Sequence, residues 1–209
     1  MEELDSDDKI DNSVLAEKDK VLLNRSWSFW ENYESKDRSI EYSKLIKEIY
    51  TFDNIISFWQ FWNKYPGNDA NKIFFNGEDI TFFFKEKFRV ISMNLFEKGI
   101  RPEWEDEKNK KGKIFSLEYD IKQDLQGFLN EVNKSWVKLI SLLIGEQLPA
   151  SQYINGIRFV DKVKFGKNVL FRFEIWTNSS IETNDIEKLA QFLSDTFGAK
   201  ANVKEINKG

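Results

Sequence analysis

The chain has 209 residues, of which 41% are hydrophobic and 15% aromatic, so it can bury one core of ordinary single-domain size. It contains no Cys and no His, which excludes disulfides, thiolate zinc sites, cysteine nucleophiles and the commonest general base. The acidic start is unlike a secretory signal, and no run of about 18 apolar residues could span a bilayer. The composition predicts a soluble protein of a reducing compartment, without most familiar catalytic centres.

The net charge of −4 is concentrated at the start of the chain. Residues 1–20 hold eight acids against three lysines, a charge of −5, so the remainder carries +1. This polar segment has few large apolar side chains to bury. We therefore expect a disordered acidic tail over residues 1–20 and a single domain over residues 21–209.

In chain order, loosely alternating aromatic residues at 22–30 predict a first strand, and the polar residues 31–39 predict a loop. Asp53 is a suitable N-cap for a helix over residues 54–63, which stops before Pro66. The apolar side chains of this helix cover roughly 220° of the helical wheel, well beyond the ~100° stripe of a surface helix. Part of the helix should therefore face something other than the core.

The middle of the chain alternates predicted strands with one long helix. Aromatic runs on both sides of Asn76-Gly77 predict a hairpin over residues 72–84. Residues 88–96 and 114–119 predict further strands, and a one-sided apolar pattern predicts a helix over residues 124–145.

The last third of the chain predicts a hairpin and a final helix. Residues 158–164 and 169–176 form the arms of the hairpin, and the helix begins at 183 or 184 and is capped by Gly198. Because the strands connect largely through hairpins, we expect an antiparallel sheet with helices packed on one face, an α+β fold.

The sequence places Trp104 in a polar loop, between a turn at residues 99–102 and a charged run at residues 106–113. On chemistry alone, the indole could simply pack on the sheet beside a solvated loop. An indole next to the carboxylate of Glu105 also suits a cationic, planar base, because the ring face attracts positive charge and the carboxylate accepts hydrogen bonds. Catalytic carboxylates or a Mg²⁺ site at residues 105–107 are the alternatives, although consecutive acids point in different directions.

The second predicted hairpin carries a charge of +4 over fifteen residues. Its charged residues are Arg158, Lys162, Lys164, Lys167 and Arg172, against Asp161. Exposed lysines on a hairpin usually serve only solubility. On alternating positions, however, some of these cations share one face, where they could hold phosphate oxygens.

Five segments resemble the eukaryotic translation initiation factor 4E family in order and approximate spacing, over residues 22–198. They are Trp27-Ser28-Phe29-Trp30, Phe52-Asp53 before Phe58-Trp59, Gly99 to Lys110, Leu143-Ile144-Gly145-Glu146 and Ile175-Trp176-Thr177. The resemblance implies a curved antiparallel β-sheet with helices packed on its convex face. It further implies a pocket on the concave side, where two aromatic rings sandwich the 7-methylguanosine cap of messenger RNA, with no catalysis, cofactor or metal.

The resemblance also assigns roles to residues of that pocket. Trp104 would stack on one face of the base, and Tyr42, where most family members have Trp, would stack on the other. Glu105 would accept hydrogen bonds from guanine, and Trp176 would contact the methyl group. Phosphate-binding cations carry over onto Lys113, Lys162 and Arg172, with Lys164 and Lys167 as alternatives.

On the helices, the resemblance implies a docking surface for a helical motif of initiation factor 4G or of competing 4E-binding repressor proteins. The residues concerned are Ile55, Trp59, Val137 and Ile144. Lys138 stands where the family has an acid, and Ser141 where it has Leu, so partner identity could differ. Residues 66–85 are longer than the family's equivalent, which predicts an inserted hairpin beside the cap-binding face.

The implied function is binding of capped messenger RNA, with 7-methyl-GTP as the minimal ligand, and recruitment of a 4G-type scaffold to start translation. We expect a monomer that lies in the cytoplasm, or in both the cytoplasm and the nucleus, and that does not bind a membrane. The alternatives are a cap-binding repressor of the same family, a cap or nucleotide hydrolase, and an interaction module whose pocket has lapsed.

Overall fold

The computed structural model describes residues 21–75, 88–120, 124–162 and 170–206. Within these residues, seven strands form one antiparallel sheet in the order β2-β1-β3-β5-β6-β4-β7. The strands are β1 (Leu22–Ser35), β2 (Ile46–Asn54), β3 (Phe88–Glu97), β4 (Lys113–Asp120), β5 (Ile154–Asp161), β6 (Leu170–Thr177) and β7 (Asn202–Glu205).

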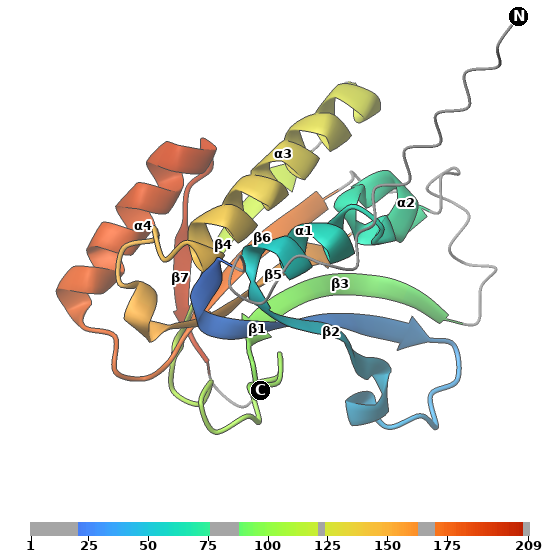
Figure 1. Cartoon of the computed structure of the whole chain (residues 1–209), viewed down its shortest axis with the longest axis horizontal. Helices are drawn as coiled ribbons and strands as arrows, with labels where there is room; N and C mark the ends of the chain where they lie inside the picture. Colours follow the sequence, from blue (N-terminus) through green and yellow to red (C-terminus); the bar gives the residue numbers. More distant parts are fainter. Residues whose placement is uncertain (1–20, 76–87, 121–123, 163–169, 207–209) are drawn as a thin grey trace, which may run out of the picture.

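The helices of the described residues lie over one face of the curved sheet (Figure 1). They are α1 (Ile55–Trp62), α2 (Ala70–Phe75), α3 (Leu125–Ile144) and α4 (Thr183–Phe197), with short 3₁₀ turns η2 (Tyr42–Leu45), η3 (Pro66–Asn68) and η5 (Ser151–Tyr153). In this part of the chain, no helix combines the length and apolar character needed to cross a membrane. The prediction of an α+β fold with an antiparallel sheet and helices on one face is confirmed.

Alternation along β1 divides its buried side chains between the two faces of the sheet. Trp27 and Phe29 pack into the large core beneath the helices, whereas Trp30 belongs to a smaller apolar cluster. That cluster, here called the second apolar cluster, consists of Trp30, Ile46, Phe96, Ile100, Ile114, Trp176 and Ile206. The face that the helices leave open therefore has an apolar floor of its own.

The helix predicted over residues 54–63 is α1, but its N-cap is Asn54 and not Asp53. The Asn54 side chain accepts a hydrogen bond from the Ser57 amide (2.9 Å), and the Asn54 backbone stays extended, as an N-cap requires. The final helix begins at Thr183 and is capped by Gly198, as predicted. Gly198 adopts a φ of 65°, in the left-handed region that favours glycine.

The prediction of a loop over residues 31–39 is wrong for its first part, because β1 continues to Ser35. Glu31 is only 7% exposed within this strand. The hydroxyl of Tyr65 donates a hydrogen bond to Glu31 Oε1 (2.7 Å), and the hydroxyl of Tyr33 donates to Oε2. A buried carboxylate is tolerated when its oxygens are bonded in this way, so polar composition alone misplaced the end of the strand.

The predicted hairpin over residues 72–84 is contradicted in its first arm, since Ala70–Phe75 form α2. The helix begins where Asp69 Oδ1 accepts a hydrogen bond from the Asn71 amide (2.9 Å). Its Phe74 is fully buried, with its ring 5.0 Å from that of Phe159. The remainder of that hairpin, the turn at residues 165–168 and the acidic tail at residues 1–20 lie outside the described residues.

Candidate functional site

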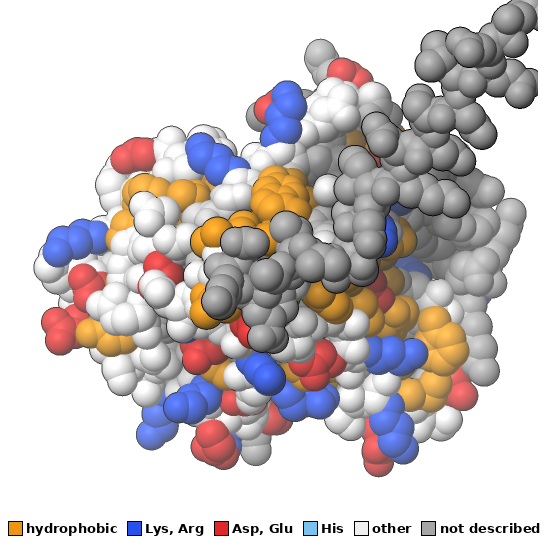
Figure 2. Space-filling model, in the orientation of Figure 1, with side chains coloured by type: hydrophobic (Ala, Val, Ile, Leu, Met, Phe, Trp, Pro, Cys, Tyr) orange, Lys and Arg blue, Asp and Glu red, His pale blue; other side chains and the backbone are white. Residues whose placement is uncertain are grey.

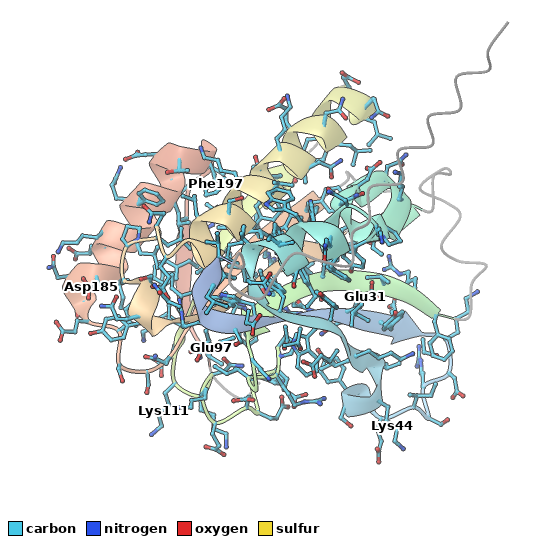
Figure 3. All side chains as sticks on the ribbon, in the orientation of Figure 1. Glu31, Lys44, Glu97, Lys111, Asp185 and Phe197 are labelled. Carbon is cyan, nitrogen blue, oxygen red and sulfur yellow. The ribbon has the colours of Figure 1, made fainter. Side chains whose placement is uncertain are left out.

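Two loops and strands β4 to β7 enclose a pocket of about 290 Å³ over the second apolar cluster. The first loop contains η2, and the second, residues 101–111, joins β3 to β4; Lys44 and Lys111 mark the two loops in Figure 3, on the side of the sheet away from the helices. Aromatic side chains from both loops and the sheet line the pocket, namely Tyr42, Trp104 and Trp176. Cations also line it: Arg158, Lys162, Arg172 and Lys204.

Tyr42 forms one wall of the pocket and is 49% exposed. Its hydroxyl oxygen accepts a hydrogen bond from the side-chain amide of Asn32 in β1 (3.3 Å). Arg101 of the second loop donates to the Ser43 carbonyl (3.3 Å) and places its guanidinium 5.6 Å from the centre of the Trp30 ring. The two loops are therefore tied to each other and to the sheet.

Trp104, from the second loop, also lines the pocket and stays 39% exposed because a buried amide supports its loop from within. Asn109, which is fully buried, donates to the carbonyls of Arg101 and Glu103, both at 2.8 Å. Its own oxygen accepts a hydrogen bond from Asn155 of β5 (2.9 Å). These bonds satisfy the loop backbone without the indole, so Trp104 lies at the pocket and is not a core residue under a solvated loop.

Trp176 lies in the floor of the pocket and is 4% exposed. Its indole nitrogen donates to Glu174 Oε2 (3.1 Å), and the Arg158 guanidinium lies 5.2 Å from its ring centre. The ring also meets Phe96 edge to face, with centroids 5.8 Å apart. Position and orientation of this indole are therefore set by both polar and apolar contacts.

Glu174 is the buried acid that holds the cations of the floor together. Its carboxylate pairs with Arg158 through one oxygen and with Arg172 through the other, both at 3.3 Å. Burial raises the pKa of Glu174, but Arg158, the Trp176 hydrogen bond, Arg172 and Lys162 outweigh it, so the pKa is lowered and the carboxylate stays ionised at neutral pH.

Lys162 and Lys204 differ from the two arginines of the pocket, because neither ammonium pairs with a carboxylate among the described residues. Arg172, by contrast, is shared between Glu118 (2.7 Å) and Glu174 (3.3 Å). Burial lowers the pKa of Lys162, and neighbouring Arg172, Arg158 and Lys204 lower it further against the opposing effect of Glu174. An anion in the pocket would relieve this repulsion.

The structure thus brings together five of the seven residues predicted for the pocket: Tyr42, Trp104, Trp176, Lys162 and Arg172. Glu105 adjoins Trp104 but is exposed and does not line the cavity, and within the described residues its carboxylate has no hydrogen-bond or ion-pair partner. Lys113 also lies outside the lining, with its ammonium 3.3 Å from Glu205.

The consecutive acids of the second loop do not converge on one point. Asp106 accepts hydrogen bonds from the backbone amides of Arg101 and Lys108, both at 2.9 Å, and Glu107 pairs with Lys110. Over the described ranges, no group of three or more acidic side chains is placed to hold a metal ion. The hypotheses of paired catalytic carboxylates and of a Mg²⁺ site in this loop find no support in the geometry.

Glu174 and Lys204 were not among the residues predicted from the sequence, and Arg158 was predicted only as one of the hairpin cations. A signal existed for Glu174: residues 172, 174 and 176 alternate along one strand, so their side chains share a face. Lys204 had no such signal, because all four residues of β7 are exposed and the strand shows no apolar alternation.

The residues predicted to contact a partner lie on α1 and α3, on the helical side of the sheet. Trp59 is 40% exposed, Ile55 and Val137 are partly buried, and Ile144 is 5% exposed within the core. Figure 2 shows hydrophobic side chains reaching the surface over α3. Lys138 donates to the carbonyl of Thr196 at the end of α4 (3.2 Å). Of this set, Trp59 offers the most apolar surface and Ile144 very little.

Comparison with known proteins identifies relatives of this chain. The family model for eukaryotic initiation factor 4E matches residues 22–206. Initiation factor 4E of Candida albicans is 28% identical over 165 residues, covering 78% of this chain and 68% of that protein. The Saccharomyces cerevisiae factor is 27% identical over 161 residues, covering 77% and 63%. The chain thus spans about two thirds of the length of these curated relatives.

Solved structures share the fold. A Caenorhabditis elegans initiation factor 4E, in complex with the 4E-binding protein Mextli, superposes with a TM-score of 0.67 at 23% identity over 88% of this chain and 93% of that one. An Ascaris suum initiation factor 4E in complex with an m2,2,7G cap gives a TM-score of 0.66 at 24% identity over 91% and 93%. With the family model matching nearly the whole described chain, the protein belongs to the eukaryotic initiation factor 4E family.

Proposed function

We propose that this protein binds the 7-methylguanosine cap of messenger RNA in the pocket and, through α1, recruits a 4G-type scaffold to start translation in the cytoplasm. The observation that carries the proposal is that two half-exposed aromatic rings, Tyr42 and Trp104, line one pocket together with several Lys and Arg side chains. Relatives of this family have been solved with cap analogues and with 4E-binding proteins, which supports both halves of the proposal.

The two rings would select the methylated base. Methylation at N7 makes guanine cationic, and a cation between two ring faces gains from their quadrupoles by about 0.5–2 kcal/mol per ring. Tyr42 offers less area and a weaker quadrupole than an indole, so Trp104 would contribute more of the stacking. Trp176, in the floor, would lie against the methyl group.

Glu105 is the acid best suited to recognise guanine. Its carboxylate is free of partners among the described residues and lies next in sequence to Trp104. Glu103 does line the pocket, but its carboxylate is already bound by Arg101 at 2.7 Å. A free carboxylate can accept two hydrogen bonds from adjacent N–H donors of a charged base, which adenine cannot supply.

The triphosphate would lie at the basic end of the pocket. Lys162 and Lys204 are the cations best placed for it, because no acid of the described residues neutralises them. Arg172 also lines the pocket, but its guanidinium already pairs with Glu118 and Glu174, so we expect it to contribute less to phosphate binding. Lys113, held by Glu205 outside the lining, would join only if that ion pair opens.

Titration of tryptophan fluorescence with 7-methyl-GTP and with GTP tests cap binding directly. We expect the methylated nucleotide to bind much more tightly and its affinity to fall with salt, because phosphate contacts are ionic. Glu105→Gln should weaken binding of 7-methyl-GTP, whereas the matched variant Glu107→Gln, in the same loop but paired with Lys110, should not. Equal affinity for the two nucleotides would exclude a cap site.

Partner recruitment is tested on the opposite face. Trp59→Ala should abolish binding of a helical 4G-type peptide and leave the response to 7-methyl-GTP intact, because Trp59 lies on α1 and not in the pocket. Peptide binding without any nucleotide response would favour an interaction module with a lapsed pocket. A cap-binding repressor would bind both ligands yet fail to support translation of capped RNA in a depleted extract.

A further inference from the structure

A row of hydrogen-bonded side chains crosses the sheet beneath the pocket and ends on the Tyr42 hydroxyl. The row, here called the amide relay, runs from Arg158 of β5 through Asn94 of β3 and Asn32 of β1 to Tyr42 of η2. Arg158 Nε lies 2.9 Å from Asn94 Oδ1, Asn94 Nδ2 lies 2.9 Å from Asn32 Oδ1, and Asn32 Nδ2 lies 3.3 Å from the Tyr42 oxygen.

The direction of every bond in the relay follows from the arginine. A guanidinium has only donors, so the side-chain oxygen of Asn94 must face Arg158. The amide nitrogen of the Asn94 side chain then faces Asn32 and must meet the Asn32 side-chain oxygen. This turns the amide nitrogen of Asn32 toward Tyr42. Tyr42 is therefore the acceptor of the last bond, and its hydroxyl proton is left to donate to an acceptor outside the relay.

Burial makes the relay rigid. Asn32 and Asn94 are both fully buried, where an unpaired amide would be costly. Both polar atoms of the Asn94 side chain make further hydrogen bonds. The oxygen also accepts from Ser92 (3.1 Å), and the amide nitrogen also donates to the Trp30 carbonyl (3.3 Å). Such a fully bonded amide has no alternative orientation, so the direction of the relay cannot reverse without breaking bonds.

We propose that Asn32 and Asn94 are positioning residues that hold the Tyr42 ring against the pocket and direct its hydroxyl proton to an oxygen acceptor of the bound nucleotide. The inference rests on the proposed function, since it deepens the role of Tyr42 in the same pocket. In this arrangement a phenol has an advantage over an indole. A phenol oxygen can accept the hydrogen bond from the Asn32 side-chain amide, whereas an indole N–H only donates and would face another donor.

The relay itself is tested in the free protein. In ¹⁵N-labelled protein, Tyr42→Phe should shift the side-chain amide resonances of Asn32 and, through the shared bond, those of Asn94. The matched variant Tyr50→Phe removes a hydroxyl from a tyrosine that does not line this pocket, and should leave both resonances in place. Because Tyr42 is half-exposed, its variant is expected to fold. Unchanged Asn32 resonances in Tyr42→Phe would refute the relay.

The effect on binding is tested by a double-mutant cycle with 7-methyl-GTP. Tyr42→Phe and Asn32→Leu should each weaken binding by roughly two- to tenfold, the range of one hydrogen bond, and the double variant should lose no more than either single one. Asn32→Asp replaces the donor at Tyr42 by an acceptor. The Tyr42 ring stays in place, but its hydroxyl proton turns toward the sheet, so this variant should weaken binding by a similar factor.

The outcomes separate the two proposals. Losses that multiply in the double variant, or single variants that bind like the wild type, would overturn the positioning role while leaving cap binding standing. A wild type that does not bind 7-methyl-GTP would instead overturn the proposed function, and the resonances of the free protein would still decide whether the relay exists.

Discussion

Replacing Glu174 by Gln removes the buried negative charge that pairs with Arg158 and Arg172 in the floor of the pocket. The carboxylate of Glu174 is 6% exposed, and its partners Arg158 and Arg172 are 15% and 20% exposed, so the three charges are poorly screened by water. A glutamine keeps the shape and one acceptor oxygen for Trp176. Its amide nitrogen, however, would face a guanidinium, donor against donor.

The expected cost is set by what remains after the substitution. Breaking a buried ion pair by removing one partner typically destabilises by about 3–5 kcal/mol. Glutamine retains an acceptor, and the arginines keep bonds to Asn94 and Glu118. We therefore expect a loss of about 2–3 kcal/mol in the free energy of unfolding, at or just below the lower limit of that range.

Urea denaturation followed by far-ultraviolet circular dichroism measures this loss, and Glu205→Gln is the matched control. Glu205 also lines the pocket and pairs with one cation, Lys113, but its carboxylate is 47% exposed, so the same change of charge should cost less than about 1 kcal/mol. If Glu174→Gln destabilises no more than Glu205→Gln, the reasoning from burial is refuted.

The same variant carries a dependence on pH. The pKa of Glu174 is lowered from 4.5 in the folded protein, since its cationic neighbours and the Trp176 hydrogen bond outweigh the effect of burial. Its ionised form therefore adds stability that is present above pH 4.5 and is lost as the pH falls through the folded value. The difference in free energy of unfolding between the wild type and Glu174→Gln should therefore become smaller over that acidic range. A difference that stays constant with pH would contradict a lowered pKa of Glu174.

Three further substitutions test the packing around the site by urea denaturation. Asn109→Ala should cost about 2–3 kcal/mol and also weaken nucleotide binding, because two loop carbonyls lose the donor that holds them at 2.8 Å; normal binding would mean that the loop is held otherwise. Gly112→Ala should cost more than about 2 kcal/mol, since an added Cβ would overlap the Thr177 carbonyl oxygen; a small cost would show that this approach relaxes. Tyr119→Phe should leave stability unchanged or raise it by about 1 kcal/mol, because burial raises the pKa of Tyr119 to about 12 and its hydroxyl has no partner among the described residues; a clear loss would reveal a hydrogen bond.

Local sequence patterns determined the long, strongly periodic elements of this protein. The helical period over residues 124–145 and the alternation over residues 169–176 specify α3 and β6, because each pattern suits only one backbone geometry over that length. The resemblance of the Trp104 loop to a known family predicted that this loop contributes to the pocket. The polar residues around Trp104 left two placements of its indole open, packed on the sheet or facing a ligand.

Tertiary structure decided what those patterns leave open. Glu31 stays in a strand because Tyr65, distant in the chain, donates to its carboxylate, and residues 70–75 form a helix because Phe74 is buried against Phe159. The pocket's second wall, its buried acid and Lys204 come from segments that meet only when β1, β6 and β7 enter one sheet. A side chain's partners depend on this assembly, so its charge state and direction cannot be read from its sequence neighbours alone.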